Sequence, residues 1–429
     1  MRTFDKKSVD MSDTPRCLSY KKGDQNHVYE PIVPHVQDSR CSTSKDRVSG
    51  EGDAFFCRLK TGVLVCSQCN SNQLILKGNV DRQFRMVPVG TERIFLHVPV
   101  QRVLCLRCGS LRQVRLPFAD PKKHYTRSFA RYALALCRHM TILDVARHLG
   151  VSWDVIKEIQ KEHLKKRYSR PKLKHLRRIA IDEISIGKGH RYLTVVLDLE
   201  SGAVVFVGEG KGADALDPFW KRLRSSGAKI EAVAIDMSPA YIEAVRSNLP
   251  VAWIVYDRFH VMKLYNDKLS DLRREVFHEA TDKLQKNVLK GSRWLLLKNP
   301  ENLHPEKEAK RLNEMLALNQ PLATAYYMRE ELRQLWEQEG VLQAQTFLES
   351  WCDRAESSGI RMLVEMAHTI QMHRWGIYAW YGYPISTAAL EGTNNKIKTM
   401  QRQAYGFRDR EFFMLKIYAI HEARYALVG

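Results

Sequence analysis

The stretch from residue 179 to residue 257 constrains the fold of this chain more than any other. Three apolar segments separated by glycine-containing turns open it, and we predict β-strands at 179–186, 192–199 and 203–210. An amphipathic helix and a strand then follow twice, at 216–223, 231–237, 240–248 and 252–257. A three-stranded meander followed by alternating helices and strands is the order of a ribonuclease H-like sheet. We therefore expect an α/β domain of this kind.

Two acidic residues lie on the first and fourth of these strands. Asp182 is in the first strand, and Asp236 is at the carboxyl end of the fourth. Because these strands are neighbours in such a sheet, their carboxylates are expected to share a metal ion. An acid at a strand end is more often a solvated residue, and Asp198 and Asp257 also end strands, so either is an alternative ligand. Glu183 should point to the opposite face, because side chains alternate along a strand.

A third acid comes from much later in the chain. Helical composition continues from residue 260 to Pro384, which indicates an all-α insertion, and Ser386 or Thr387 can then cap a new helix that carries Glu391. Two divalent ions held by carboxylates can activate the nucleophile and stabilise the leaving oxygen in an in-line attack on phosphorus. We therefore predict that Asp182, Asp236 and Glu391 bind Mg²⁺ or Mn²⁺, provided that the Glu391 helix packs back across the sheet.

The helix that carries Glu391 also has a polar and cationic face. Asn395, Lys398 and Arg402 follow Glu391 at positions i+4, i+7 and i+11, which share one helical face. This stripe suits a phosphate backbone beside the metal site. A solvated helix face is the alternative interpretation.

Paired cysteines indicate a second metal site. Cys66-x-x-Cys69 and Cys105-x-x-Cys108 form two knuckles, and four thiolates in this pairing suit a closed, structural zinc site. The surrounding residues 54–118 are expected to form a small β-rich module that needs the metal for stability. The remaining cysteines have no such pairing: Cys17 and Cys41 are interpreted as bystanders, Cys57 (with the nearby His97) as surplus to the site, and Cys137 and Cys352 as buried apolar residues.

Residues 119–168 have the pattern of a helix-turn-helix. A helix, a break at Gly150 and a second helix follow one another, and the predicted core residues are Ala146, Leu149, Val151 and Ile156. The start of the second helix would then contact DNA, and the basic run that follows it would contact phosphates. The predicted DNA-binding residues are Ser152, Trp153, Lys157, Lys165, Lys166 and Arg167. A helical hairpin without a role in DNA binding is the alternative.

The overall charge favours a polyanionic partner. Lys and Arg total 68 against 48 Asp and Glu, a formal net charge of +20, and the basic residues are clustered along the sequence. No apolar run approaches the ~20 residues that span a bilayer, and the polar start lacks a signal-peptide core, so we expect a cytoplasmic protein without a membrane partner.

Trp294 stands out within the predicted insertion. Stacking on an unpaired base is one interpretation of an aromatic side chain in a protein of this kind. Burial among the helices of the insertion is the interpretation we favour for Trp294.

Several segments together resemble the ISL3 family of bacterial insertion-sequence transposases. They are the 66–108 cysteine module, HLGVSWDVIKEI, IAIDEISI, AIDMSPAYIEAV, VYDRFHVMK, WLLLKNPENL and EGTNNKIKTMQRQAYGFRD. The resemblance covers about residues 55–425 and implies a DDE transposase with Asp182, Asp236 and Glu391 as its triad. It also implies binding to terminal inverted repeats and cut-and-paste movement. The sequence departs from many relatives at Thr387, where they have Asn, and in its long amino-terminal segment.

We therefore expect a multidomain α/β protein with a ribonuclease H-like core. The predicted parts are an irregular segment (1–53), a zinc module (54–118), a helix-turn-helix (119–168), a basic linker (169–178), the first part of the core (179–262), an α-helical insertion (263–384) and the rest of the core (385–429). Its predicted partners are double-stranded DNA, as terminal repeats and target, and a second copy of itself. A DNA-binding regulator without chemistry and a structure-specific nuclease are the alternative functions.

Overall fold

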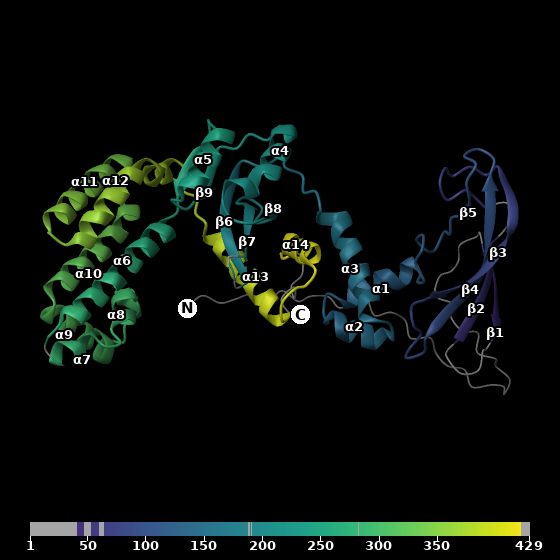
Figure 1. Ribbon diagram of the computed structural model, residues 1–429, viewed down its shortest axis with the longest axis horizontal. Coiled ribbons are helices and arrows are strands. Elements are labelled where there is room, and N and C mark those ends of the chain that lie inside the picture. Colours follow the sequence, from purple (N-terminus) through teal and green to yellow (C-terminus); the bar gives the residue numbers. More distant parts are fainter. Residues whose placement is uncertain are drawn as a thin grey trace, which may run out of the picture. The chain divides into compact units, whose positions relative to one another are not determined.

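The computed structural model describes residues 41–46, 53–59, 64–187, 189, 191–281 and 283–421. The chain divides into two compact units, Met1–Thr126 and Arg127–Gly429 (Figure 1). Each unit has a hydrophobic core of its own. Residues 1–40, which include Cys17, lie outside the described residues.

A β-sheet forms the described part of the first unit. Its strands, in the order β1-β2-β4-β3 with β5 beside β4, are β1 (Cys41–Asp46), β2 (Asp53–Leu59), β3 (Leu74–Arg85), β4 (Ile94–Cys105) and β5 (Leu111–Gln113). Alternate residues of β4, among them Leu96, Val98 and Val100, are buried in the core. The β-rich prediction for this part of the chain agrees with these strands.

Strand β1 lies within the segment 1–53, which the sequence predicts to be mostly irregular. It pairs with β2 along its whole length, from Cys41 opposite Leu59 to Asp46 opposite Ala54. Its sequence, CSTSKD, has no apolar alternation that marks a strand. The backbone pairing with β2 therefore makes the strand, and a local pattern could not show it.

The second unit begins with three helices, α1 (Arg127–Leu136), α2 (Ile142–Leu149) and α3 (Trp153–Tyr168). The Oγ1 atom of Thr141 caps α2 by accepting a 3.0 Å hydrogen bond from the Asp144 N–H. Gly150 ends α2 in the left-handed conformation, with φ of 61°. The predicted helix-turn-helix is confirmed at this point, since Ala146, Leu149 and Ile156 are buried and Val151 is half-buried.

A second sheet follows, and its described strands have the order β10-β9-β6-β7-β8. They are β6 (Arg178–Gly187), β7 (Arg191–Asp198), β8 (Val204–Glu209), β9 (Ala232–Ile235) and β10 (Trp253–Tyr256). Strands β6, β7 and β8 form an antiparallel meander, whereas β9 runs parallel to β6 and β10 parallel to β9. The first and fourth strands are therefore neighbours, as predicted.

Helices cover both faces of this sheet. On one face, Ile181 and Val233 pack with Phe219 of α4 (Asp217–Ser226) and Tyr241 of α5 (Pro239–Asn248). The other face meets α13 (Ala388–Gln403) and α14 (Arg410–Tyr418). There the small side chains of Ala180 and Ala234 leave room for Leu390 and Ile397 of α13, which lies along β6 (Figure 1). Helix α13 therefore packs back against the sheet, as its predicted role requires.

Between β10 and α13 the described chain is helical, as predicted for the insertion. Its α-helices are α6 (Arg258–Glu279), α7 (Lys283–Leu289), α8 (Arg293–Leu297), α9 (Lys310–Leu318), α10 (Gln320–Arg333), α11 (Val341–Ser357) and α12 (Arg361–Gly382). Two buried aromatic side chains join them: Tyr265 donates a 2.7 Å hydrogen bond to the Ala325 carbonyl, and Trp351 a 2.9 Å bond to that of Met328. None of the described helices is long and apolar enough to cross a membrane.

Candidate active site and metal centre

Both carboxylate oxygens of Asp182 are held by protein hydrogen bonds. Its Oδ1 accepts a 2.8 Å bond from the Glu183 N–H, and its Oδ2 accepts a 2.8 Å bond from Nδ2 of Asn394 on α13. Burial raises the pKa of Asp182, and the negative charges of Asp236 and Glu183 raise it further, whereas the Glu183 N–H bond and the charge of His260 lower it. The site therefore holds the carboxylate in one orientation and makes its charge costly unless a cation neutralises it.

Asp236 lies directly after β9, which neighbours β6. It is half-buried, and its Oδ1 accepts a 3.0 Å hydrogen bond from the Ser238 N–H at the start of α5. Because side chains alternate along strands, Asp236 continues the face of Ala234 just as Asp182 continues that of Ala180. Both acids therefore belong to the face that α13 covers.

Glu391 lies in the first turn of α13, three residues before Asn394. Its side chain is half-buried, and within the described residues its carboxylate has no hydrogen bond or ion pair. The described chain holds one group of three or more His, Cys, Asp or Glu residues with all ligand atoms within 4.8 Å, and that group is cysteine. The structure thus places the three acids on the side of the sheet that α13 covers, although their ligand atoms do not all lie within 4.8 Å of one another.

Neighbouring acids have other partners. Glu183 points to the opposite face, as predicted, where its Oε2 accepts a 3.4 Å hydrogen bond from the Tyr241 hydroxyl of α5. Asp198 is buried and accepts a hydrogen bond from the Glu200 N–H in the turn after β7. Asp257 is also buried and accepts a 2.6 Å bond from the Thr387 hydroxyl. Both alternative ligands are therefore already occupied by structural bonds.

Sequence reasoning missed two residues beside Asp182. Asn394 was overlooked in favour of its neighbour Asn395, although its position three residues after Glu391 places both on one side of the helix. His260, in the first turn of α6, lies close enough for its charge to lower the pKa of Asp182. Its position just after the strand-ending Asp257 was an available signal.

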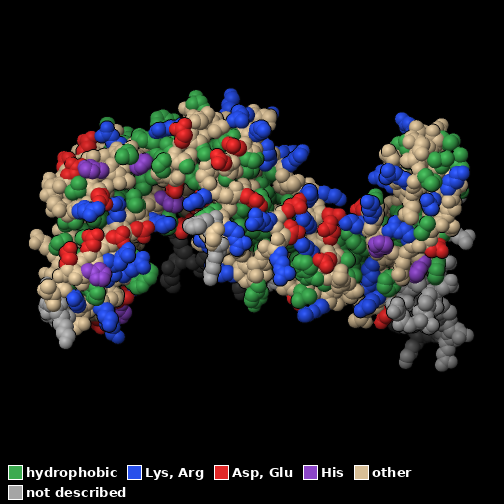
Figure 2. Space-filling view, in the orientation of Figure 1, with side chains coloured by type: hydrophobic (Ala, Val, Ile, Leu, Met, Phe, Trp, Pro, Cys, Tyr) green, Lys and Arg blue, Asp and Glu red, His purple; other side chains and the backbone are tan. Residues whose placement is uncertain are grey.

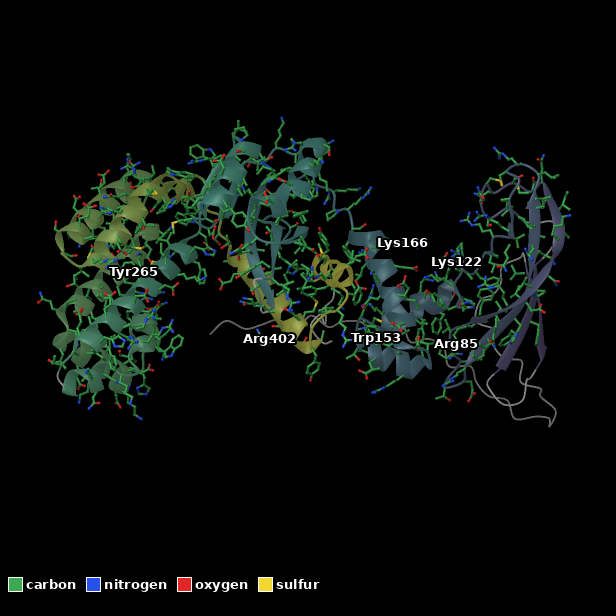
Figure 3. The ribbon with its side chains drawn as sticks, in the orientation of Figure 1. Arg85, Lys122, Trp153, Lys166, Tyr265 and Arg402 are labelled. Carbon is green, nitrogen blue, oxygen red and sulfur yellow. The ribbon has the colours of Figure 1, made fainter. Side chains whose placement is uncertain are left out.

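The predicted cationic face of α13 is exposed. Asn395, Lys398 and Arg402 are all accessible to solvent, and Arg402 lies near the carboxyl end of α13 (Figure 3). Within the described residues, Lys398 and Arg402 form no ion pair. Both cations are therefore available to a phosphate.

The four predicted zinc ligands come together in the first unit. The Sγ atoms of Cys66 and Cys108 lie 3.7 Å apart, those of Cys69 and Cys105 lie 3.5 Å apart, and all four lie within 4.8 Å of one another. A tetrahedron with Zn–S bonds of about 2.3 Å has edges of roughly 3.8 Å. The four thiols thus fit a zinc ion.

Matching backbone turns present these thiols. Asn70 and Gly109 each follow the second cysteine of a knuckle and adopt left-handed conformations, with φ of 58° and 67°. Backbone N–H groups of Cys69 and Gln68 lower the pKa of the Cys66 thiol to about 6, whereas burial and the neighbouring thiols raise the pKa of Cys69 to about 11. His97 stacks on Phe56 instead, with ring centroids 5.0 Å apart, so it is not a ligand.

Two other cysteines fit the prediction of burial to different degrees. Cys352 is buried, and burial raises the pKa of its thiol to about 12. Cys137 is half-buried, with a thiol pKa that burial raises to about 11. The side chains of Cys41 and Cys57 lie outside the described residues.

The predicted DNA-binding residues of α3 divide into two groups. Ser152, Trp153 and Lys166 are exposed, and Figure 3 places Trp153 and Lys166 towards opposite ends of α3. Lys157 and Lys165, in contrast, form ion pairs of 3.0 and 2.7 Å with acids at the start of α14. Arg167 is exposed and lies over the Tyr168 ring.

Helix α14 is thus bound to α3. Asp409 pairs with Lys157 and Lys161, and Glu411 with Lys161 and Lys165. Beneath these ion pairs lies a small apolar cluster of Leu164, Phe412 and Leu415. Three lysines of α3 that the sequence left as unpaired cations are therefore engaged by carboxylates of α14, which the sequence did not indicate.

One further expectation needs correction. Trp294 is 67% exposed on α8, because this short helix buries Leu295 and Leu296 and turns Trp294 outward, so its predicted burial is wrong. On the visible face of the second unit, basic side chains are spread among acidic ones rather than gathered in one patch (Figure 2).

In chain order, four clustered cysteines and a helix-turn-helix precede a mixed sheet with two acids on its α13 face, an arrangement typical of a DNA-processing enzyme. Comparison with known families agrees with this class. Residues 63–108 match the zinc finger of transposases IS204/IS1001/IS1096/IS1165, residues 114–164 the helix-turn-helix domain of transposase family ISL3, and residues 179–417 the ISL3 DDE transposase domain.

The curated relatives are transposases, and they match this chain over most of their length. The transposase for insertion sequence element IS1001 of Bordetella parapertussis is 36% identical over 83% of this chain and 88% of its own. The transposase for insertion sequence element IS1557 of Mycobacterium tuberculosis is 29% identical over 84% of this chain and 87% of its own. Among solved structures, the Drosophila P element transposase strand transfer complex matches 68% of this chain and 92% of its own, with 9% identity and a TM-score of 0.38. The chain belongs to the ISL3 family of DNA transposases.

Proposed function

We propose that this transposase binds the terminal inverted repeats of its element and moves it by cut-and-paste strand transfer. Asp182, Asp236 and Glu391 form its catalytic triad and bind Mg²⁺ or Mn²⁺. One observation carries the assignment: Asp182 lies on β6 and Asp236 directly follows the neighbouring parallel strand β9, on the face packed by the helix that bears Glu391.

The sheet supports a ribonuclease H-like catalytic core. Strand β6 lies in the centre of the sheet. The antiparallel strands β7 and β8 lie on one side of it, and the parallel strands β9 and β10 lie on the other. The helices from α6 to α12 interrupt this core before α13 returns to it. We accordingly propose the core as residues 179–262 and 385–429, with residues 263–384 as the insertion.

The donor set suits a hard divalent cation. Three carboxylates on one face offer the oxygen ligands that Mg²⁺ prefers, and the cost of ionising buried Asp182 falls when a cation is near. Divalent ions held there would activate the attacking oxygen and stabilise the leaving one. The residues supply orientation: the Glu183 N–H and the Asn394 amide aim the Asp182 carboxylate.

DNA would contact side chains of both α3 and α13. The proposed contacts are Ser152, Trp153, Lys157, Lys165, Lys166 and Arg167 on α3, and Asn395, Lys398 and Arg402 on α13. Because two ends of an element must be brought together, we propose a homodimer or larger assembly, at work in the bacterial cytoplasm on the nucleoid. Exposed Trp294 is accessible to an unpaired base.

A strand-transfer assay tests the proposal. A labelled DNA that carries the inverted repeats flanking the coding sequence is incubated with a plasmid, Mg²⁺ and the zinc-loaded full chain. Wild type is expected to yield joined product, and Asp182→Asn to bind the repeats with unchanged affinity but to leave the DNA uncut. Cleavage by the purified Asp182→Asn variant would sink the assignment.

The same assay separates the alternative functions. Binding without nicking by the wild type identifies a regulator that keeps DNA affinity without chemistry. Nicking without a joined product identifies a structure-specific nuclease. Either result rejects transposition as the activity of this chain.

A further inference from the structure

Asn394 links the Glu391 helix to the first acid of the proposed triad. Its side chain is 6% exposed, and its Nδ2 donates the 2.8 Å hydrogen bond to Oδ2 of Asp182. The other oxygen of Asp182 is held by the Glu183 N–H. The amide therefore fixes the rotation of a carboxylate whose orientation matters for metal binding.

The chemistry of this bond determines which way the amide faces. An ionised carboxylate only accepts hydrogen bonds, so the NH₂ group of Asn394 must face Asp182 and its Oδ1 must face away. That Oδ1 is buried, and within the described residues it has no hydrogen-bond partner. A buried oxygen that has lost its hydrogen bonds to water and gained none in the protein destabilises the fold. The site thus contains an acceptor that lacks a donor.

A metal-bound water is the donor that this position fits. Mg²⁺ gives up its waters reluctantly and usually keeps several when carboxylates bind it. Groups around a metal site commonly orient its ligands through hydrogen bonds. Asn394 lies beside Asp182 and one helical turn after Glu391, whose carboxylate has no partner among the described residues.

We propose that Asn394 is a positioning residue for the divalent ion: its Nδ2 orients Asp182, and its Oδ1 accepts a hydrogen bond from a water on the ion. This inference rests on the proposed Asp182–Asp236–Glu391 site. It adds a residue that contacts the metal only through water and through Asp182.

Gln401 provides a matched control on the same helix. Its Nε2 donates a 2.6 Å hydrogen bond to the Ile186 carbonyl, so it too joins α13 to β6 by a side-chain amide. Its partner is a backbone carbonyl rather than a carboxylate. Loss of Gln401 should therefore weaken the packing of α13 without changing the metal site.

Metal affinity, measured without DNA or catalysis, tests the inference. Free Mn²⁺ is titrated by electron paramagnetic resonance against the zinc-loaded full chain. Asn394→Ala is expected to weaken Mn²⁺ binding by about 10-fold or more, the range seen for groups that orient metal ligands. Gln401→Ala is expected to bind Mn²⁺ within about twofold of wild type while unfolding at a lower temperature. Asn394→Ala affinity within twofold of wild type would overturn the inference.

Asp182→Asn separates failure of the inference from failure of the site. If Asp182→Asn keeps wild-type Mn²⁺ affinity, the proposed site itself is wrong. If it loses affinity and Asn394→Ala does not, only the role of Asn394 is wrong. A wild-type crystal structure with Ca²⁺ needs no variant: we expect a water between the ion and Asn394 Oδ1, and an Oδ1 bonded to a protein donor would contradict the inference.

Discussion

The hydroxyl of Thr387 donates a 2.6 Å hydrogen bond to the carboxylate of Asp257, and both side chains are buried, at 1% and 3% exposure. Asp257 immediately precedes α6, where the chain enters the helical region, and Thr387 immediately precedes α13, where the chain has left it. The bond therefore ties the two ends of that region together. It gives a physical reason why a helix so late in the sequence returns to the sheet.

Removing this hydroxyl should destabilise the second unit. Thr387→Val keeps the shape of the side chain but leaves the buried Asp257 carboxylate without that donor. We expect the free energy of unfolding to fall by about 1–3 kcal/mol, measured by urea denaturation. Thr387→Ser, which keeps the hydroxyl, should lose less. Equal stability of the Val and Ser variants would show that the bond contributes nothing.

Glu391→Gln should separate activity from stability. Because the Glu391 carboxylate has no partner among the described residues, its loss should change the free energy of unfolding by less than about 0.5 kcal/mol. Cleavage of terminal-repeat DNA should fall by roughly two orders of magnitude or more, since metal coordination contributes several kcal/mol.

An exposed acid in the helical region supplies the control for this experiment. Glu306→Gln removes the same charge at a position far along the chain from the triad. It should cleave at the wild-type rate. A Glu391→Gln protein that cleaves as fast as Glu306→Gln would remove Glu391 from the triad.

The cysteine cluster should account for the bound zinc. Cys66→Ser combined with Cys69→Ser removes one of two knuckles, and we expect about one equivalent of zinc to be lost, as determined by elemental mass spectrometry. The first unit should then become sensitive to protease, because its small sheet depends on the metal. Cys137→Ser, outside the cluster, should retain zinc. Unchanged zinc in the double variant would disprove the site.

The contact between α3 and α14 should weaken in acid. Burial would raise the pKa of Asp409, but the Phe412 N–H, Lys161 and Lys157 together lower it to about 2. A carboxylate whose pKa is depressed in the folded state stabilises the fold above its unfolded pKa of about 4 and loses that contribution as the pH falls towards 2. The loss therefore falls between about pH 4 and pH 2.

Comparison with Asp409→Asn isolates this effect from other acid-sensitive groups. The stability difference between wild type and variant, measured by urea denaturation, should be constant from pH 7 to pH 5 and shrink below about pH 4. A difference that stays constant down to pH 3 would show that the ion pairs of Asp409 do not contribute.

Local patterns in the sequence were sufficient to predict many of the helices and strands and the local motifs. Strand and helix periodicity in residues 179–257 predicted the sheet order, and the spacing of the cysteines predicted a cluster whose thiols do lie together. Gly150 predicted the break between α2 and α3, where it adopts the left-handed conformation. These features depend on neighbouring residues, so a short window of sequence contains their cause.

Long-range packing decided the rest. Asn394 rather than Asn395 meets Asp182 because the rotation of α13 is set by Leu390 and Ile397 against the sheet. Trp294 is exposed because its two leucine neighbours occupy the core. The ion pairs of α3 with α14, and the strand β1, join segments that no local pattern connects. Each depends on which surfaces bury apolar area together, a property of the whole fold that residue order alone does not display.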